Sequence, residues 1–218
     1  MKPFRSTQMS LPFEPQTAEG LLFNEALGLL IGEILRWVPD LNHIKLNQLR
    51  VSVTYNKSRS RSGLLAYLLP MKFRGGSPVE VRHRGKHVYH WAMLPQFHEG
   101  REILYLIYFM VPRFTNLSFR DKLETIIHEL YHVHPDFNGD LRRFSGRSQW
   151  HGNMKDYDRK VSQMTDCFLN SPHNPHVYEF LKGNHGRLMR KYGNIRMEKI
   201  REPRPRLLKK LPLPSVSV

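Results

Sequence analysis

The clearest hydrophobic pattern in the chain runs from about Ser118 to Val133. Apolar side chains recur there at helical spacing and form one stripe, which comprises Leu123, Ile126, Ile127, Leu130 and Val133. Polar side chains occupy the opposite side of the helix, and Glu129 lies at the border of the stripe at about 100° per residue. The pattern predicts a helix with one face in a hydrophobic core and the other face in a cleft.

Weaker patterns on either side predict the other elements. An apolar segment from about Thr17 to Trp37 predicts a largely buried helix, which Pro39 ends. Pro70 indicates an edge position or a bend in the second of the predicted strands. Strands are predicted at about Gln48–Tyr55, Leu64–Phe73, Val79–His83, His87–Met93 and Glu102–Val111, with a basic turn at Asn56–Gly63. Further helices are predicted at about Met154–Leu169 and His176–Gly183.

The order of these elements predicts the fold class. A helix, several β segments and then helices are typical of an α+β fold. We expect a small antiparallel sheet that packs against the helix of residues 118–133, together with N-terminal and C-terminal helices. Along the chain we expect an irregular arm at residues 1–16, one folded domain at residues 17–185, and a basic, proline-containing tail at residues 186–218.

The composition is that of an ordinary globular protein. Cys167 is the only cysteine among 218 residues, which argues against a disulfide framework and fits a reducing compartment. We expect it to be a small buried residue on a helix. Residues 1–16 lack the apolar core of a signal peptide, and charged residues interrupt the apolar segment at residues 21–38. We therefore expect a cytoplasmic protein without a membrane span.

Positive charge is the second informative feature of the chain. The formal net charge is +15, and from Lys182 to Lys210 eleven lysines and arginines stand against only Glu198 and Glu202. Such a segment attracts the phosphates of nucleic acids without sequence preference. A solvated tail with no dedicated partner would have the same composition. Non-specific DNA or RNA is therefore a candidate partner of the C-terminal segment.

The side chains with the clearest chemistry lie on the helix of residues 118–133. Residues 128–132 read His-Glu-Leu-Tyr-His, which is the HExxH spacing. Residues four apart lie one above the other on a helix, so His128 and His132 could bind one zinc ion on the side away from the apolar stripe. Glu129 would lie beside that ion, where it could take a proton from a water molecule. The motif predicts a zinc-dependent hydrolase.

A catalytic zinc site needs a third protein ligand, and three downstream residues are candidates. His151 follows a loop that is long enough to return to the metal, and Gly152 beside it permits close backbone approach. Asp140 lies in an Asn-Gly-Asp turn, where it could either supply a carboxylate or stabilise the turn. His134 precedes a proline, which disfavours a helical conformation at that position. His151 is preferred on these grounds, and the other two stay open.

The motif and its spacing resemble the SprT-like zinc metallopeptidases. In that family HExxH is followed, after a variable loop, by a His-Gly pair that matches His151-Gly152. The segment Phe137–Phe144 also resembles a bacterial and phage group of metallopeptidases, and the similarity covers roughly residues 45–170. The resemblance implies zinc ligands at His128, His132 and His151, a general base at Glu129, and an association with DNA-bound proteins. The paired cysteines of the zinc ribbon that many members carry are absent from this chain.

Three functions follow from the site as hypotheses. The first is a zinc-dependent peptidase whose protein or peptide substrate lies extended along an exposed strand edge. Tyr131, Arg142 and Tyr157 are its candidate oxyanion donors, although Tyr157 also fits the core face of its helix. The second is a zinc-containing nucleic-acid-binding protein with a structural or degenerate site. The third is another zinc hydrolase that acts on a non-peptide substrate.

A further group of histidines, His83, His87, His90 and His98, clusters in the sequence. His83 and His87 could face each other across the turn of the predicted hairpin and bind a second metal ion. No cysteine or carboxylate pattern accompanies them, so surface histidines are the simpler interpretation.

Overall fold

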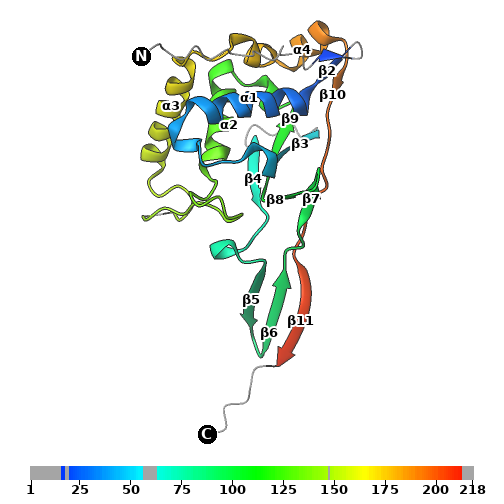
Figure 1. The fold of residues 1–218 in the computed structure, drawn as a ribbon, viewed down its shortest axis with the longest axis vertical. Helices are drawn as coiled ribbons and strands as arrows, with labels where there is room; N and C mark the ends of the chain where they lie inside the picture. The colour runs from blue at the N-terminus through cyan, green and yellow to red at the C-terminus, as the bar shows by residue number, and fades with distance from the viewer. Residues whose placement is uncertain (1–15, 18–19, 56–62, 147, 213–218) are drawn as a thin grey trace, which may run out of the picture.

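The structure is a mixed α+β fold of small sheets and helices (Figure 1). This computed structural model describes residues 16–17, 20–55, 63–146 and 148–212, so the expected arm at 1–16 and turn at 56–63 lie almost entirely outside it. The α-helices are α1 Phe23–Trp37, α2 Phe119–Tyr131, α3 Met154–Leu169 and α4 His185–Tyr192. The 3₁₀ helices are η1 Pro39–Leu41, η2 Leu46–Gln48, η3 Arg74–Gly76, η4 Phe114–Asn116 and η5 Pro175–Leu181. The strands are β1 Gln16–Thr17, β2 Gly20–Leu22, β3 Leu49–Tyr55, β4 Ala66–Pro70, β5 Val79–Arg84, β6 His87–Ala92, β7 Gln96–His98, β8 Arg101–Ile103, β9 Tyr105–Val111, β10 Ile195–Arg196 and β11 Arg206–Pro212.

The central sheet has the strand order β3-β9-β4. All seven residues of β9 are buried, which explains the continuous apolar run that predicted a central strand. β4 lies at one edge and pairs antiparallel with β9, and Pro70 is its last residue. β3, however, pairs in parallel with β9, so the expected antiparallel arrangement is wrong for this pair. A parallel pair needs a long crossover, and here the chain that forms β4 to β8 supplies it.

One hydrophobic core joins the central sheet to α1, α2 and α3. The α2 stripe predicted from the sequence lies in this core, and its five residues Leu123, Ile126, Ile127, Leu130 and Val133 are fully buried. Leu68 and Ile107 contribute to the same cluster from the sheet. A smaller cluster, which includes Leu106 and Tyr108, holds the alternate residues of β9. The central sheet therefore separates the helices from a second, smaller apolar layer.

A second three-stranded sheet, made of β5, β6 and β11, projects away from the helices (Figure 1). β5 and β6 form the predicted hairpin around Gly85-Lys86. β11 pairs antiparallel with β6, so residues that we expected in a tail form part of this projecting sheet. Earlier residues of the same segment form α4 and β10 at the other end of the molecule (Figure 1). The basic residues of the C-terminal segment are therefore divided between two distant places.

Two predicted boundaries are wrong for local reasons. The first helix begins at Phe23 and not near Thr17, because Gly20–Leu22 pairs with β10 as strand β2. The predicted strand at Glu102–Val111 is divided into β8 and β9 at Leu104, whose N–H donates to the carbonyl of Gln48. None of the described helices is long and apolar enough to cross a membrane.

Two further expectations about the C-terminal half need correction. Cys167 is exposed, because its position on α3 lies about 100° from the middle of the buried face. Its thiol donates to the carbonyl of Trp37 at 3.6 Å. The helix expected at His176–Gly183 is the 3₁₀ helix η5, with N–H groups that bond three residues back, as from Lys182 to Glu179.

Lys122 is a buried lysine of α2, with an exposed fraction of 1%. Its Nζ donates to the carbonyls of Leu181 at 2.8 Å and Gly183 at 2.6 Å, which ties α2 to the end of η5. Burial lowers the pKa of Lys122 to about 8, because the ammonium loses water and gains only neutral carbonyl partners.

The stability of the protein should therefore rise with pH above about 8. An unfolded lysine keeps its proton up to about pH 10.4, so the unfolded state binds more protons in this interval and the free energy of unfolding increases by about 2 kcal/mol between pH 8 and 10. Lys122→Met should remove this increase, and Lys155→Met, an exposed lysine on α3, should retain it. Urea unfolding from pH 7.5 to 10 measures the effect. Identical pH profiles for wild type and Lys122→Met would contradict this origin.

Candidate metal centre

Helix α2 holds the HExxH residues in a fixed orientation. Its first turn is capped by Ser118, whose hydroxyl accepts the N–H of Asp121 at 3.1 Å. The helix ends at Tyr131, and His132 still has the helical angles φ −73° and ψ −14° as its C-cap. The imidazoles of His128 and His132 therefore lie one helical turn apart, with their ring centroids separated by 4.9 Å.

The loop after α2 returns the chain to this helix. The N–H of Arg142 donates to the carbonyl of His132 at 2.7 Å, which holds the first part of the loop against the helix end. Further on, Ser148 and Gly152 form a β-bridge that closes a tight turn. Gly152 has φ +60°, and a Cβ at this position would lie 2.9 Å from the carbonyl oxygen of Ser145. Glycine is therefore needed where the sequence predicted close backbone approach, and the turn places His151 beside α2.

The three histidines converge on one point. The Nε2 atom of His128 lies 3.2 Å from that of His132 and 3.3 Å from that of His151. Two ligands that bind one zinc ion tetrahedrally at 2.0–2.1 Å would lie about 3.3 Å apart, so these separations fit shared coordination. One ligand atom from each histidine lies within 4.8 Å of those of the other two. These side chains could hold a metal ion.

The other two ligand candidates lie elsewhere. Asp140 is buried, and its carboxylate accepts hydrogen bonds from the N–H groups of Gly75 and Leu141 and from Arg143. Burial raises the pKa of Asp140, but Arg143 and these two N–H groups lower it by more, so the group stays ionised. The Nδ1 atom of His134 accepts the N–H of Asp136 at 3.2 Å. Asp140 stabilises its turn, and neither residue joins the histidine cluster.

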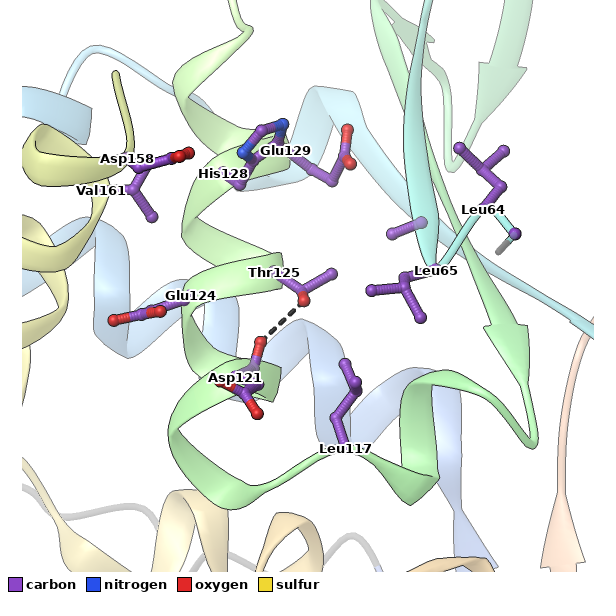
Figure 2. A pocket seen from close by; sticks show the side chains of 12 residues that line it. Leu64, Leu65, Leu117, Asp121, Glu124, Thr125, His128, Glu129, Asp158 and Val161 are labelled. Carbon is purple, nitrogen blue, oxygen red and sulfur yellow. Dashed lines mark hydrogen bonds between the residues drawn. The ribbon is translucent and has the colours of Figure 1, made fainter. Parts of the chain in front are cut away.

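Glu129 lies next to this cluster but faces the edge of the central sheet. Figure 2 shows its carboxylate directed from α2 towards β4, beside the ring of His128. Its exposed fraction is 8%. Burial raises the pKa of Glu129 to about 7, and a hydrogen bond from the backbone N–H of Leu68 opposes this shift. Glu129 is therefore partly protonated at neutral pH, and its hydrogen bond from Leu68 holds it at the edge of β4.

The imidazoles of His128 and His132 are neutral at physiological pH. Burial, followed by the nearby His151, lowers the pKa of His128 to about 4. Burial also lowers the pKa of His132 to about 3, with smaller contributions from His128, His151 and Arg142. A metal ligand must present an unprotonated nitrogen, so this environment favours cation binding over protonation.

Tyr157 of α3 packs against all three histidines. Its ring centroid lies 4.9 Å from that of His128, 5.4 Å from His132 and 4.8 Å from His151. Its hydroxyl donates to the carbonyl of His128 at 3.0 Å. Burial, followed by the charge of Glu129, raises the pKa of Tyr157. The sequence predicted a core position for this residue, but helical spacing alone could not indicate that it contacts the histidines.

A cleft of about 640 Å³ opens beside His128 and Glu129 (Figure 2). The start of β4, the exposed side of α2 and one side of α3 form its walls. Leucines line the side of the cleft near β4, and carboxylates from α2 and α3 line the opposite side (Figure 2). The apolar residues are Leu64, Leu65, Leu117 and Val161, and the carboxylates are those of Asp121, Glu124 and Asp158. The cleft therefore has a charge opposite to that of the chain as a whole.

The histidines of the projecting sheet do not form a comparable group. His83 lies opposite Val88, and His87 lies opposite Arg84, so the two histidines are not directly paired across the hairpin. Within the part of the chain that the structure describes, His128, His132 and His151 are the group of metal-binding side chains that comes together.

The comparisons with known proteins leave the chain to be interpreted from its own residues. No protein-family model, curated protein or solved structure matches it. The interpretation of this site therefore depends on the geometry described above and on the HExxH and His-Gly spacing.

Proposed function

We propose that this protein is a zinc-dependent metallopeptidase. The observation that carries the proposal is the convergence of three Nε2 atoms, from His128, His132 and His151, beside a buried glutamate at the margin of a cleft. Three histidines leave one tetrahedral position open, which is the arrangement of catalytic zinc sites. A structural site needs neither the cleft nor the glutamate, so these two features favour catalysis over the alternative of a structural zinc protein.

In the proposed reaction, the metal and the side chains of this protein have different roles. Zinc bound by the three imidazoles would polarise a carbonyl and lower the pKa of a water molecule. Glu129 takes the proton of the attacking water and returns it to the departing amine. Burial raises the pKa of Glu129, which makes its carboxylate a stronger base for this proton transfer. The hydrogen bond from Leu68 keeps the carboxylate in place between these two steps.

Tyr131 and Arg142 are the remaining candidates to stabilise the oxyanion. The hydroxyl of Tyr157 is already bonded to the carbonyl of His128, so Tyr157 positions the histidines instead. The guanidinium of Arg142 lies 4.4 Å from the centroid of the Tyr131 ring and is close enough to His132 to lower its pKa. A cation at this position would stabilise negative charge that develops near the metal.

The exposed edge of β4 provides a place for an extended substrate. The carbonyl of Leu65 accepts the N–H of Met110 in β9, so by strand alternation the backbone groups of Ala66 and Leu68 point to the opposite edge. That edge borders the cleft and contacts Glu129. Because the N–H of Leu68 already bonds to Glu129, a polypeptide could pair with the remaining backbone groups of this edge, and the carboxylates of the cleft would suit a basic side chain.

Metal removal tests the proposal. Protein treated with a zinc chelator should lose cleavage of a casein substrate, and one equivalent of zinc per chain should restore it, because the proposed reaction needs the metal for every turnover. Elemental analysis must show that the treated sample is metal-free. Undiminished cleavage by that metal-free sample would contradict the proposal, and so would a zinc-loaded protein that cleaves no polypeptide.

A further inference from the structure

A second hollow lies on the face of the central sheet that is turned away from the helices. Its volume is about 430 Å³, and its floor includes Tyr67 of β4 and Tyr108 of β9. Both tyrosines belong to the smaller apolar cluster, whereas the helices pack against the larger one. This outer hollow is therefore on the opposite side of the sheet from the core that carries the metal centre.

The floor of the outer hollow contains an unused polar group. Tyr108 has an exposed fraction of only 2%, and its hydroxyl has no hydrogen-bond partner among the described residues. Burial raises its pKa to about 12, so the hydroxyl keeps its proton and can donate. The ring of Tyr67 stacks on it with centroids 4.7 Å apart, and the Tyr67 hydroxyl donates to Glu202 at 3.2 Å. A buried hydroxyl without a partner is costly, which points to a ligand with a polar edge.

The rim of the outer hollow is basic. Lys199, Arg201 and Arg204 line it, and all three are exposed. None of them forms an ion pair with a carboxylate in the part of the chain that the structure describes. Unpaired basic side chains around an aromatic floor provide contacts for a ligand that carries both negative charge and planar rings.

The same segment continues directly into the projecting sheet as β11. Directly opposed residues of antiparallel strands share a face, so Lys210 and Arg82, which both lie opposite Tyr89, are on one face with it. Trp91 lies on this face as well, two residues along β6. The Nζ of Lys210 is 5.7 Å from the centroid of the Tyr89 ring. This face of the projecting sheet therefore carries both aromatic and basic side chains, with Arg82 paired to Glu80 and Lys210 beside Tyr89.

We propose that the outer hollow and this face of the projecting sheet bind single-stranded nucleic acid. The phosphates contact the basic side chains, and exposed bases stack on the aromatic rings. The polar edge of a base bonds to the Tyr108 hydroxyl. A duplex hides its base faces, and an acidic peptide has no regular series of planar rings, so neither would use both kinds of contact. Because the surface is separate from the metal centre, this binding does not depend on peptidase activity.

Fluorescence anisotropy with a labelled 20-nucleotide single strand tests the location of the surface. Arg201→Ala/Arg204→Ala and Tyr89→Ala/Lys210→Ala should each raise Kd at least about tenfold, since each pair removes a phosphate contact or a stacking contact. The matched control is Arg187→Ala/Arg190→Ala on α4, which makes the same charge change as the first pair at the other end of the molecule. It should raise Kd less than about threefold. Equal weakening by the control and the Arg201/Arg204 pair would overturn the proposed location.

An abasic strand of the same length tests the recognition of bases. Wild-type protein should bind this strand and a 20-base-pair duplex at least about tenfold more weakly than the normal single strand. Tyr108→Phe removes only the hydroxyl, so it should weaken binding of the normal strand while leaving binding of the abasic strand unchanged and without lowering the melting temperature. Equal affinity for all three nucleic acids would show a general polyanion surface and overturn the proposal. No effect of Tyr108→Phe on the normal strand would overturn the role of the hydroxyl.

Discussion

Glu129→Gln should abolish peptide-bond cleavage while the protein keeps its metal and its fold. Glutamine cannot accept a proton at neutral pH, so the water would lose its general base, and kcat/KM should fall by about 10²–10⁴-fold. The side chain keeps its shape, and its amide oxygen can still accept the N–H of Leu68. Stability should therefore not fall, because the variant replaces a buried ionisable group with a neutral one.

The measurement combines initial rates on a peptide substrate with metal content and thermal unfolding of the same samples. Glu25→Gln is the matched control, since Glu25 is exposed on α1 and the same chemical change there should leave the rate unaltered. An inactive Glu129→Gln variant that had also lost its metal would not support a base role. Wild-type rates in a metal-loaded, folded Glu129→Gln variant would contradict the assignment of Glu129.

His151→Ala should lower the affinity for zinc by more than about 100-fold, an effect larger than the loss of a group that only orients a ligand. It would leave two imidazoles from one helical turn, and two protein ligands do not make a stable catalytic site. His134→Ala and Asp140→Ala are the controls, because both residues were ligand candidates from the sequence and both lie outside the cluster. Both should keep wild-type affinity when folded.

A competition titration of metal-free protein against a chromophoric chelator measures these affinities. Asp140→Ala should be less stable than wild type, because the Asp140 carboxylate accepts hydrogen bonds from two backbone N–H groups and forms an ion pair with Arg143. The fold of this variant must therefore be checked by circular dichroism. Wild-type zinc affinity in His151→Ala, together with a loss in folded His134→Ala or Asp140→Ala, would contradict the ligand set.

Local periodicity predicted the helices and strands that bury one of their faces in the core. Short-range hydrophobic periods predicted three features from the sequence: the apolar stripe of α2, the alternation in β3 and the extent of α3. The parallel pairing of β3 with β9 could not be predicted in this way, since it depends on the path of some fifty intervening residues. β11 was missed because its sequence Arg206–Pro212 has basic residues and a proline where a strand pattern would have apolar ones.

In the candidate site too, local features could be predicted from the sequence and long-range contacts could not. The spacing of His128 and His132 on one helix is a local property, so their proximity followed from the motif. The choice between His151 and Asp140 depended on a turn closed by Gly152 and on an ion pair with Arg143, which are long-range or loop features. The contacts of Tyr157 with the three histidines arise from the packing of α3 on α2, and no sequence period encodes them.

Binding of zinc by His128, His132 and His151 is tested by the zinc content of wild-type protein that was never exposed to a chelator, measured together with X-ray absorption at the zinc edge. We expect one zinc per chain, bound by three nitrogen ligands at about 2.0 Å with a further light ligand in the open position. Folded protein that contains no zinc and cannot take it up would contradict the proposed zinc site. So would a zinc ion whose ligands persist unchanged when His128, His132 and His151 are all replaced by alanine.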